Sequence, residues 1–385
     1  MTTIPAQSAP GRFPAIDELR GLVIILMALD HVRDYFTSVR FPPTDLAHTT
    51  PALFATRWIT HLCAPIFIFL AGVSARLFAS RNPRATLQRF LFTRGLWLVV
   101  LEFTVVMFVW MFNFRYPLGL VMQVIWATGV SMCVLSGLVV LPPAYVGAFG
   151  ALMIGLHNLL DPIAPARFGA WAPLWRILHV EGETPVGLVI YPLVPWIGVM
   201  AVGFALGSVY AWEPARRRRT LLWLGGISCA GFILLRAVNA YGDPVPWSTQ
   251  RSPMFSLLSF LNVTKYPPSL AYVLITLGPG LIALVALEAG TGPIRAGLRT
   301  FGRVPLFAYV VHIALLHLLA GVIGMVLGYG ATMLTNIFLF YPTNWGFGLP
   351  GVYLAWATVI AVLYPLCRWF AAVKRRRTDW WLAYL

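Results

Sequence analysis

Long apolar segments of about twenty residues alternate with shorter polar connections along nearly the whole chain. A segment of this length and composition crosses the hydrocarbon of a bilayer as an α-helix. Dividing the chain at its polar breaks predicts about ten membrane-spanning helices. Their expected extents are 17–36, 56–79, 94–114, 117–141, 144–160, 187–211, 220–241, 269–288, 304–327 and 350–372. The pattern therefore predicts an all-α, polytopic integral membrane protein.

The composition supports the same class of protein. Of the 385 residues, 59% are hydrophobic and only 11% are charged, and the mean hydropathy is +0.77, which is far from a soluble composition. The net charge of +15 does not indicate a nucleic-acid partner, because the arginines cluster at the ends of apolar segments. The four cysteines are widely spaced and show neither metal-ligand nor disulfide spacing. The lipid bilayer is the expected partner.

Basic residues gather in alternate connections, which predicts the topology. The basic sets are Arg81, Arg84, Arg89 and Arg94; Arg216 to Arg219; Arg295, Arg299 and Arg303; and Lys374 to Arg377. Cytoplasmic loops carry an excess of Lys and Arg, so we expect both termini in the cytoplasm. The expected organisation is a cytoplasmic tail over 1–15, a single transmembrane domain over 16–373, and a basic cytoplasmic tail over 374–385. The Pro-rich connections, including 242–268, are expected on the outer face.

The first expected span carries an unusual set of polar residues, Asp30, His31, Arg33 and Asp34, with Arg20 nearer its start. Ionisable residues at membrane depth are expensive and usually mark a functional site. Arg20 and His31 are eleven residues apart, which is roughly 16 Å along one helix face. We expect Asp34, at i+3, to orient His31, and Asp30 to pair with Arg33 or with another helix. A neutral imidazole here suits general-base or nucleophilic catalysis.

Further polar residues extend the candidate site. His61 shares a helix face with Arg57, and His312 lies well inside the ninth expected span. We expect Arg20, His31, Asp34, Arg57, His61 and His312 to enclose one cavity that is reachable from the cytoplasm. His157 and His179 are expected to be solvated near the outer face. No histidine-carboxylate spacing resembles a zinc site, so no metal is predicted.

Several stretches, taken in order, carry a resemblance to a known family. They are residues 12–22, 26–36, 57–72, 262–270 and 301–312. They resemble bacterial members of the heparan-α-glucosaminide N-acetyltransferase catalytic family. That family implies a polytopic acyltransferase that takes an acyl group from acyl-CoA at the cytoplasmic face and delivers it to an acceptor on the opposite face. The chain also has an Arg-Gly pair, Arg20-Gly21, with a histidine, His31, eleven residues after the arginine. This spacing resembles that of the broader membrane acyltransferase-3 family.

The resemblance assigns roles to individual residues. In the broader family the histidine that ends the first helix is catalytic, which corresponds to His31, with Asp30 and Asp34 beside it. Lysosomal members place their proposed active histidine in the loop after this helix, where this chain has Asp45 and His48, so His48 is a second catalytic candidate. The expected substrate and acyl-CoA contacts are Arg20, Arg33, Asp45, Arg57, His61, Arg94, Asn262, Lys265, Tyr266, Arg303 and His312.

The expected function is therefore acyl-CoA-dependent acyl transfer in a bacterial inner membrane. The resemblance implies an acetyl group from acetyl-CoA, used as a co-substrate with no permanently bound cofactor. The acceptor would be an amino sugar, a glycan or another cell-envelope molecule, and a homodimer is one assembly left open. A transporter or flippase is the alternative, because such proteins also place Asp, His and Arg inside their helices.

Overall fold

A computed structural model describes residues 13–290, 292–377, 379 and 381–382 of the chain. It is 73% helical. In this described part, eight helical segments are long and apolar enough to cross a membrane. They are Pro51–Ala79, Arg84–Met111, Pro143–Leu160, Leu193–Ala211, Pro214–Val238, Leu270–Glu288, Pro305–Val326 and Leu349–Arg376. The predicted all-α polytopic membrane protein is confirmed.

The other two expected spans are also helical, but each is atypical. Helix α1, Pro14–Phe36, carries the charged residues of the candidate site, so its composition is unlike that of an ordinary span. Helix α6, Val124–Leu138, has only 15 residues and follows the short strand β1, Leu120–Met122. All ten expected segments thus correspond to helices, while the number that cross the membrane stays a prediction.

Several spans are assembled from consecutive helical pieces. The second joins α2 (Pro51–Ile59), a 3-10 turn (Thr60–Leu62) and α3 (Cys63–Ala79). The third joins α4 (Arg84–Leu101), a π-helical turn (Glu102–Val106) and α5 (Met107–Met111). The remaining long helices are α7 (Pro143–Leu156), α9 (Leu193–Leu206), α10 (Pro214–Val238), α12 (Leu270–Glu288), α14 (Pro305–Val326) and α16 (Leu349–Arg376).

The connections contain elements that hydropathy alone does not predict. Shorter helices are α8 (Ala172–Leu178), α11 (Pro253–Leu261), α13 (Pro293–Arg303) and α15 (Thr332–Thr335). Strands β2 (Gly182–Thr184) and β3 (Gly187–Val189) pair antiparallel, and β3 pairs in parallel with β1, with Val121 opposite Leu188. The first part of the expected span 117–141 is therefore a strand, because a short apolar run has the same hydropathy in either structure.

Basic residues expected in connections lie within helices. Helix α4 begins at Arg84, so Arg89 and Arg94 are helical, and α16 continues through Lys374 to Arg376. Arginine and lysine form helices well, and their long stems can extend the charge away from the apolar span. Helix α1 begins at Pro14, inside the expected tail 1–15; residues 1–12 of that tail lie outside the described residues.

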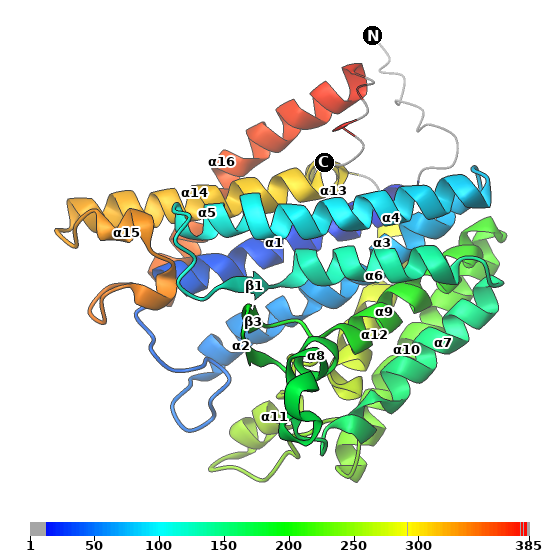
Figure 1. Cartoon of the computed structure of the whole chain (residues 1–385), viewed down its shortest axis with the longest axis horizontal. Helices are drawn as coiled ribbons and strands as arrows, with labels where there is room; N and C mark the ends of the chain where they lie inside the picture. The colour runs from blue at the N-terminus through cyan, green and yellow to red at the C-terminus, as the bar shows by residue number, and fades with distance from the viewer. Residues whose placement is uncertain (1–12, 291, 378, 380, 383–385) are drawn as a thin grey trace.

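Helix α1 runs through the middle of the helical array and packs against α3, α12, α13, α14 and α16 (Figure 1). Its approach to α13 is close, because Gly21 lies against the backbone of Leu298 and Gly302 lies against the backbone of Asp17. A side chain at either glycine would collide with the backbone of the other helix. This packing holds the first part of α1 beside the end of α13. It therefore brings Arg20 of α1 and Arg303 of α13 to the same end of the molecule.

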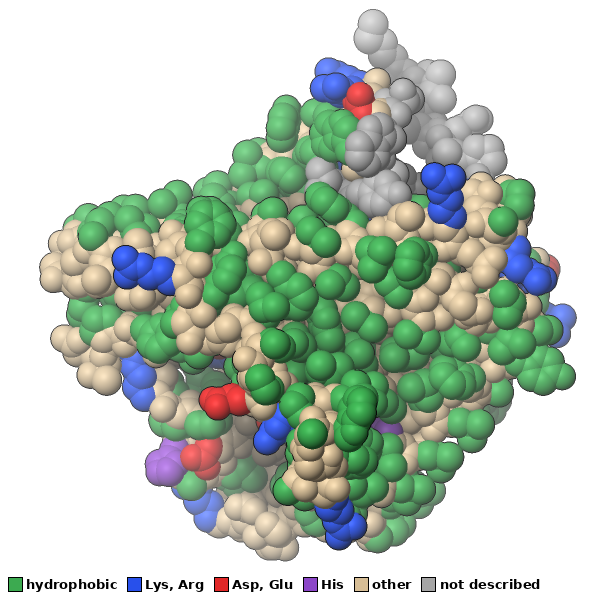
Figure 2. Space-filling view, in the orientation of Figure 1, with side chains coloured by type: hydrophobic (Ala, Val, Ile, Leu, Met, Phe, Trp, Pro, Cys, Tyr) green, Lys and Arg blue, Asp and Glu red, His purple; other side chains and the backbone are tan. Residues whose placement is uncertain are grey.

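Two sets of connections lie at opposite ends of the helices. At one end, Arg295 of α13 pairs with Glu18 of α1, and Arg217 of α10 pairs with Glu288 of α12. At the other end, Asn262 donates to the carbonyl of Thr44. Figure 2 shows hydrophobic side chains over most of the middle of one face, with Lys and Arg mainly toward its edges. The first of these two ends contains the connections that are rich in Lys and Arg in the sequence.

The orientation of these ends gives a testable prediction. Reporter fusions after residues 120, 165 and 255 should all report the outer side, because the basic connections lie at the opposite end of the helices. Fusions at both termini should report the cytoplasm. Paired alkaline phosphatase and fluorescent-protein fusions measure this directly, and a cytoplasmic signal at residue 255 would overturn the predicted topology.

Candidate functional site

A central cavity of about 410 Å³ lies beside the second half of α1. Asp30, His31, Arg33 and Asp34 line it from α1, and Arg57 and Thr60 line it from the neighbouring span. Its other polar lining residues include Thr44, Gln123, Tyr191, Lys265, Tyr266 and Tyr309. The remaining walls are mostly apolar and aromatic, which is typical of a pocket for an organic ligand. The unusual polar residues of the first span therefore face a cavity inside the protein.

His31 is half-buried and forms a pair with His312 of α14. Its Nδ1 lies 2.8 Å from Nε2 of His312, and the two rings are stacked. Nδ1 of His312 lies 2.9 Å from the carbonyl oxygen of Ala308. A carbonyl only accepts, so His312 must donate from Nδ1, and its Nε2 in the neutral ring can then accept from Nδ1 of His31. The chain of bonds leaves Nε2 of His31 as the unprotonated nitrogen.

Asp30 is the centre of a buried charge cluster. Its carboxylate lies 2.8 Å from Arg57, 2.9 Å from Arg33 and 3.8 Å from Lys265. Cations from three parts of the chain thus surround one carboxylate. The prediction that Asp30 pairs with Arg33 or with another helix is confirmed, and both pairings are present. Buried charges are retained only when they are paired in this way.

A smaller outer pocket of about 250 Å³ adjoins the central cavity. The two share Thr44, Arg57, Lys265 and Tyr266 in their linings. His61, Glu181 and Asn262 belong to the outer pocket. His61 is buried, and its ring lies 5.4 Å from that of Tyr272. Because the surrounding residues belong to the connections predicted on the outer face, this pair of cavities opens toward that end of the molecule.

A basic pocket of about 330 Å³ lies at the opposite end of the helices. Arg20, Arg94, Arg303 and Lys374 line it from four different helices. Arg20 donates 2.8 Å to Oγ of Ser74 and 3.2 Å to the carbonyl of Gly302. The structure thus places the three arginines selected in the sequence around one pocket and adds Lys374, which the sequence assigned only to a tail.

The basic pocket and the central cavity meet at a shared wall. Phe67 of α3 and Ile125 of α6 line both of them. The shared wall separates a cationic compartment at one end of the helices from a compartment with His31 at the other. The sequence pattern did not predict this partition, because Phe67 and Ile125 are ordinary apolar residues of apolar segments.

The second catalytic candidate lies in the connection after α1. Nδ1 of His48 lies 2.6 Å from Oδ2 of Asp45, and the side chain of His48 is 65% exposed. The hydrogen bond from His48 holds the pKa of Asp45 below its usual range. Thr44, the residue before Asp45, lines both the central cavity and the outer pocket. The Asp45–His48 pair therefore lies near their rim, on a solvated loop.

Three sequence-based interpretations need correction. The expected single cavity reachable from the cytoplasm is divided, since Arg20 lines the basic pocket and His61 the outer pocket. The central cavity opens toward the outer end, and His312 contacts His31 without lining that cavity. Asp34 pairs with Arg33 at 2.6 Å, and the partner that orients His31 is His312, which the long separation in sequence concealed. His157 and His179 are 2% and 1% exposed, so the prediction that they are solvated is wrong.

The fold and the site together define an α-helical membrane protein in which the buried His312 bonds to the half-buried His31, which lines the central cavity. Residues 12–233 match the family model described as heparan-alpha-glucosaminide N-acetyltransferase, catalytic, and the chain belongs to this family. It is accordingly a membrane protein of the acetyltransferase type. The matched region contains His31 and Arg57, while Lys265, Arg303 and His312 lie beyond it. A comparison with curated proteins gives no match.

Proposed function

We propose that the protein transfers an acetyl group from acetyl-CoA, bound in the basic pocket, to an acceptor in the central cavity and outer pocket. The observation that carries the proposal is the shared wall. This wall lies between the cationic pocket and the cavity that His31 lines. Family membership supplies the acetyltransferase chemistry, and the two compartments supply separate places for donor and acceptor.

The basic pocket suits the phosphates of CoA. Arginine guanidinium groups bind phosphate through paired, charge-assisted hydrogen bonds, and Lys374 adds a point charge. The eleven residues from Arg20 to His31 span roughly 16 Å along α1. An extended thioester arm that starts at these cations can follow the α1 face toward Phe67 and the histidine. Entry of the thioester requires the shared wall to open locally.

The outer compartment suits an acceptor that carries hydroxyl or amino groups. Asp30, Arg57, Lys265 and Asn262 present charged and amide groups within two adjoining cavities. Carboxylate, guanidinium and ammonium groups that pair with one another can each form further hydrogen bonds, so this lining favours a ligand rich in hydrogen-bonding groups. An amino sugar or a glycan end of the cell envelope fits this description.

The histidine pair can perform the proton transfer of the reaction. Nε2 of His31 accepts a proton from the attacking amine or hydroxyl, whose electron pair forms a bond to the thioester carbonyl carbon. The carbon–sulfur bond breaks, and the proton then passes to the CoA thiolate. His312 keeps the required tautomer through its bond to Ala308. An acetyl-histidine formed at Nε2 is the alternative route, and single-turnover labelling in the absence of acceptor distinguishes the two.

The donor site can be tested through its arginines. Substitution of Arg94 or Arg303 by alanine should raise KM for acetyl-CoA by roughly tenfold, the cost of about one charge-assisted hydrogen bond, with a smaller change in kcat. The matched control is Arg216→Ala, which removes an exposed arginine from the first turn of α10, at the same end of the molecule. Equal effects of all three substitutions would refute the donor site. Movement of substrate without acetyl-CoA consumption would favour a transporter.

A further inference from the structure

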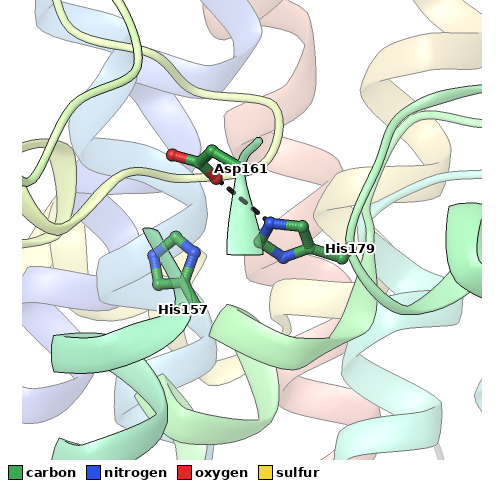
Figure 3. A group of neighbouring side chains, drawn as sticks. All are labelled: His157, Asp161 and His179. Carbon is green, nitrogen blue, oxygen red and sulfur yellow. Dashed lines mark hydrogen bonds and ion pairs between the residues drawn. The ribbon is translucent and has the colours of Figure 1, made fainter. Parts of the chain in front are cut away.

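A second cluster of ionisable side chains lies away from the acetyl-transfer site, near the outer connections. His157 follows α7, Asp161 lies in the turn after it, and His179 follows α8. The three side chains point toward one common space (Figure 3), and one ligand atom from each lies within 4.8 Å of the others. Nε2 of His179 lies 3.1 Å from Oδ1 of Asp161.

The two histidines are buried without the hydrogen bonds that buried rings require. The ring of His157 approaches the backbone of Pro268, but neither of its nitrogens makes a hydrogen bond of good geometry to a described residue, and neither does Nδ1 of His179. Buried polar atoms in native proteins nearly always have partners, and exceptions call for an explanation such as an ion. Three unpaired imidazole nitrogens in one place are difficult to explain by packing alone.

The carboxylate in this cluster is already oriented by neighbours. Asn158 donates 2.8 Å to Oδ2 of Asp161, and its own Oδ1 accepts from the backbone N–H of Leu270. This arrangement leaves Oδ1 of Asp161 directed at His179. Metal-binding carboxylates are typically held by hydrogen bonds of this kind from a residue that does not itself bind the metal.

We propose that His157, Asp161 and His179 bind one divalent transition-metal ion, with Zn²⁺ as the preferred ion. Two imidazoles and one carboxylate form a common zinc ligand set, and the nitrogen ligands disfavour Mg²⁺ and Ca²⁺. Ligand atoms around tetrahedral zinc lie roughly 3.3 Å apart. The His179–Asp161 separation of 3.1 Å is already close to this value, and the His157 ligand atom, within 4.8 Å of the other two, would have to move inward to complete the set.

Such an ion would join two separate segments at the outer end of the protein, and an existing hydrogen bond connects them to a third. It would tie the end of α7 to the connection before β2, and Asn158 extends the link to Leu270 at the start of α12. The segment just before Leu270 contains Lys265 and Tyr266, which line both the central cavity and the outer pocket. The ion would therefore stabilise the wall of the acceptor compartment, whether or not the transfer reaction is as proposed.

The site is tested by direct metal binding to the whole protein. The chain is purified in detergent with an affinity tag that contains no histidine, stripped with a chelator, and titrated with Zn²⁺ or Co²⁺. We expect one equivalent of Zn²⁺ per chain, a visible Co²⁺ spectrum of low-symmetry coordination, and a higher melting temperature with Zn²⁺. No binding to the unsubstituted protein below about 10 μM metal would overturn the proposal.

Substitutions then locate the site. His157→Ala, Asp161→Ala and His179→Ala should each weaken zinc binding at least tenfold and abolish the zinc-dependent rise in melting temperature. His48→Ala is the matched control, because it removes an exposed histidine that pairs with Asp45 in the same way. Retained one-equivalent binding in His179→Ala, or its loss in His48→Ala, would assign the metal to another place. Asn158→Ala, which removes no ligand, should weaken binding less than the three direct substitutions do.

Discussion

Substitution of His31 by alanine should abolish acetyl transfer, with a loss on the order of 10²–10⁴ in kcat, the usual contribution of a general base. Membrane insertion and acetyl-CoA affinity should change little, because the ring borders a cavity and the proposed site for the CoA phosphates lies at the other end of α1. The measurement is acetyl-CoA-dependent labelling of acceptor by the purified protein, with thioester hydrolysis followed in parallel.

Two further variants make the His31 result specific. His312→Ala should lower kcat by roughly 10–100-fold, as expected when a partner that orients a functional histidine is lost. His312→Gln should restore part of the activity, since its amide oxygen can accept from Nδ1 of His31. His48→Ala should be mild. An inactive His48 variant together with a normal His31 variant would move catalysis to the outer loop.

Substitution of Asp30 by alanine should strongly destabilise the protein. It leaves Arg33, Arg57 and Lys265 together without the carboxylate that they share. Removing one partner of a buried ion pair typically costs about 3–5 kcal/mol, because the remaining charge is buried and uncompensated. A lower melting temperature and a lower yield of monodisperse protein in detergent would report this loss.

The matched comparison for this prediction is Asp34→Ala. The Asp34 side chain is 28% exposed, and Arg33 is its one ion-pair partner among the described residues. Solvent therefore screens its loss, and a much smaller shift is expected. A double variant, Asp30→Leu with Arg57→Met, should be more stable than Asp30→Ala. It removes both members of the Asp30–Arg57 ion pair, so Arg57 is not left as a buried charge without its carboxylate. A melting temperature of Asp30→Ala equal to that of the unsubstituted protein would show that the cluster is hydrated rather than buried.

The spans could be predicted because membrane insertion depends on local composition. The expected span 269–288 and helix α12, Leu270–Glu288, differ by one residue at the start. Helix boundaries failed where charged residues continue a helix beyond the apolar segment, as Arg84 does in α4. The small sheet was missed because its pairing, Val121 with Leu188, depends on segments far apart in the sequence.

The candidate site could be predicted only where one helix carries it. The polar residues in the second half of α1 are conspicuous in an otherwise apolar segment. These four, Asp30, His31, Arg33 and Asp34, all line the central cavity. The His31–His312 pair, the Asp30–Lys265 contact and the shared wall all depend on how distant helices pack, and helical spacing contains no information on that. His157 and His179 were misjudged for the same reason, because their burial is produced by connections that fold over them.

The shared wall at Phe67 and Ile125 also has an electrical consequence. When water fills the cavities on both sides, a membrane potential falls mainly across this one layer of side chains instead of across the full bilayer thickness. A unit charge that crosses the layer then experiences nearly the whole potential, about 2.3 kcal/mol per 100 mV. Any step that separates a proton from a thiolate across Phe67 and Ile125 would therefore be voltage-dependent, although the reaction itself carries no ion through the membrane.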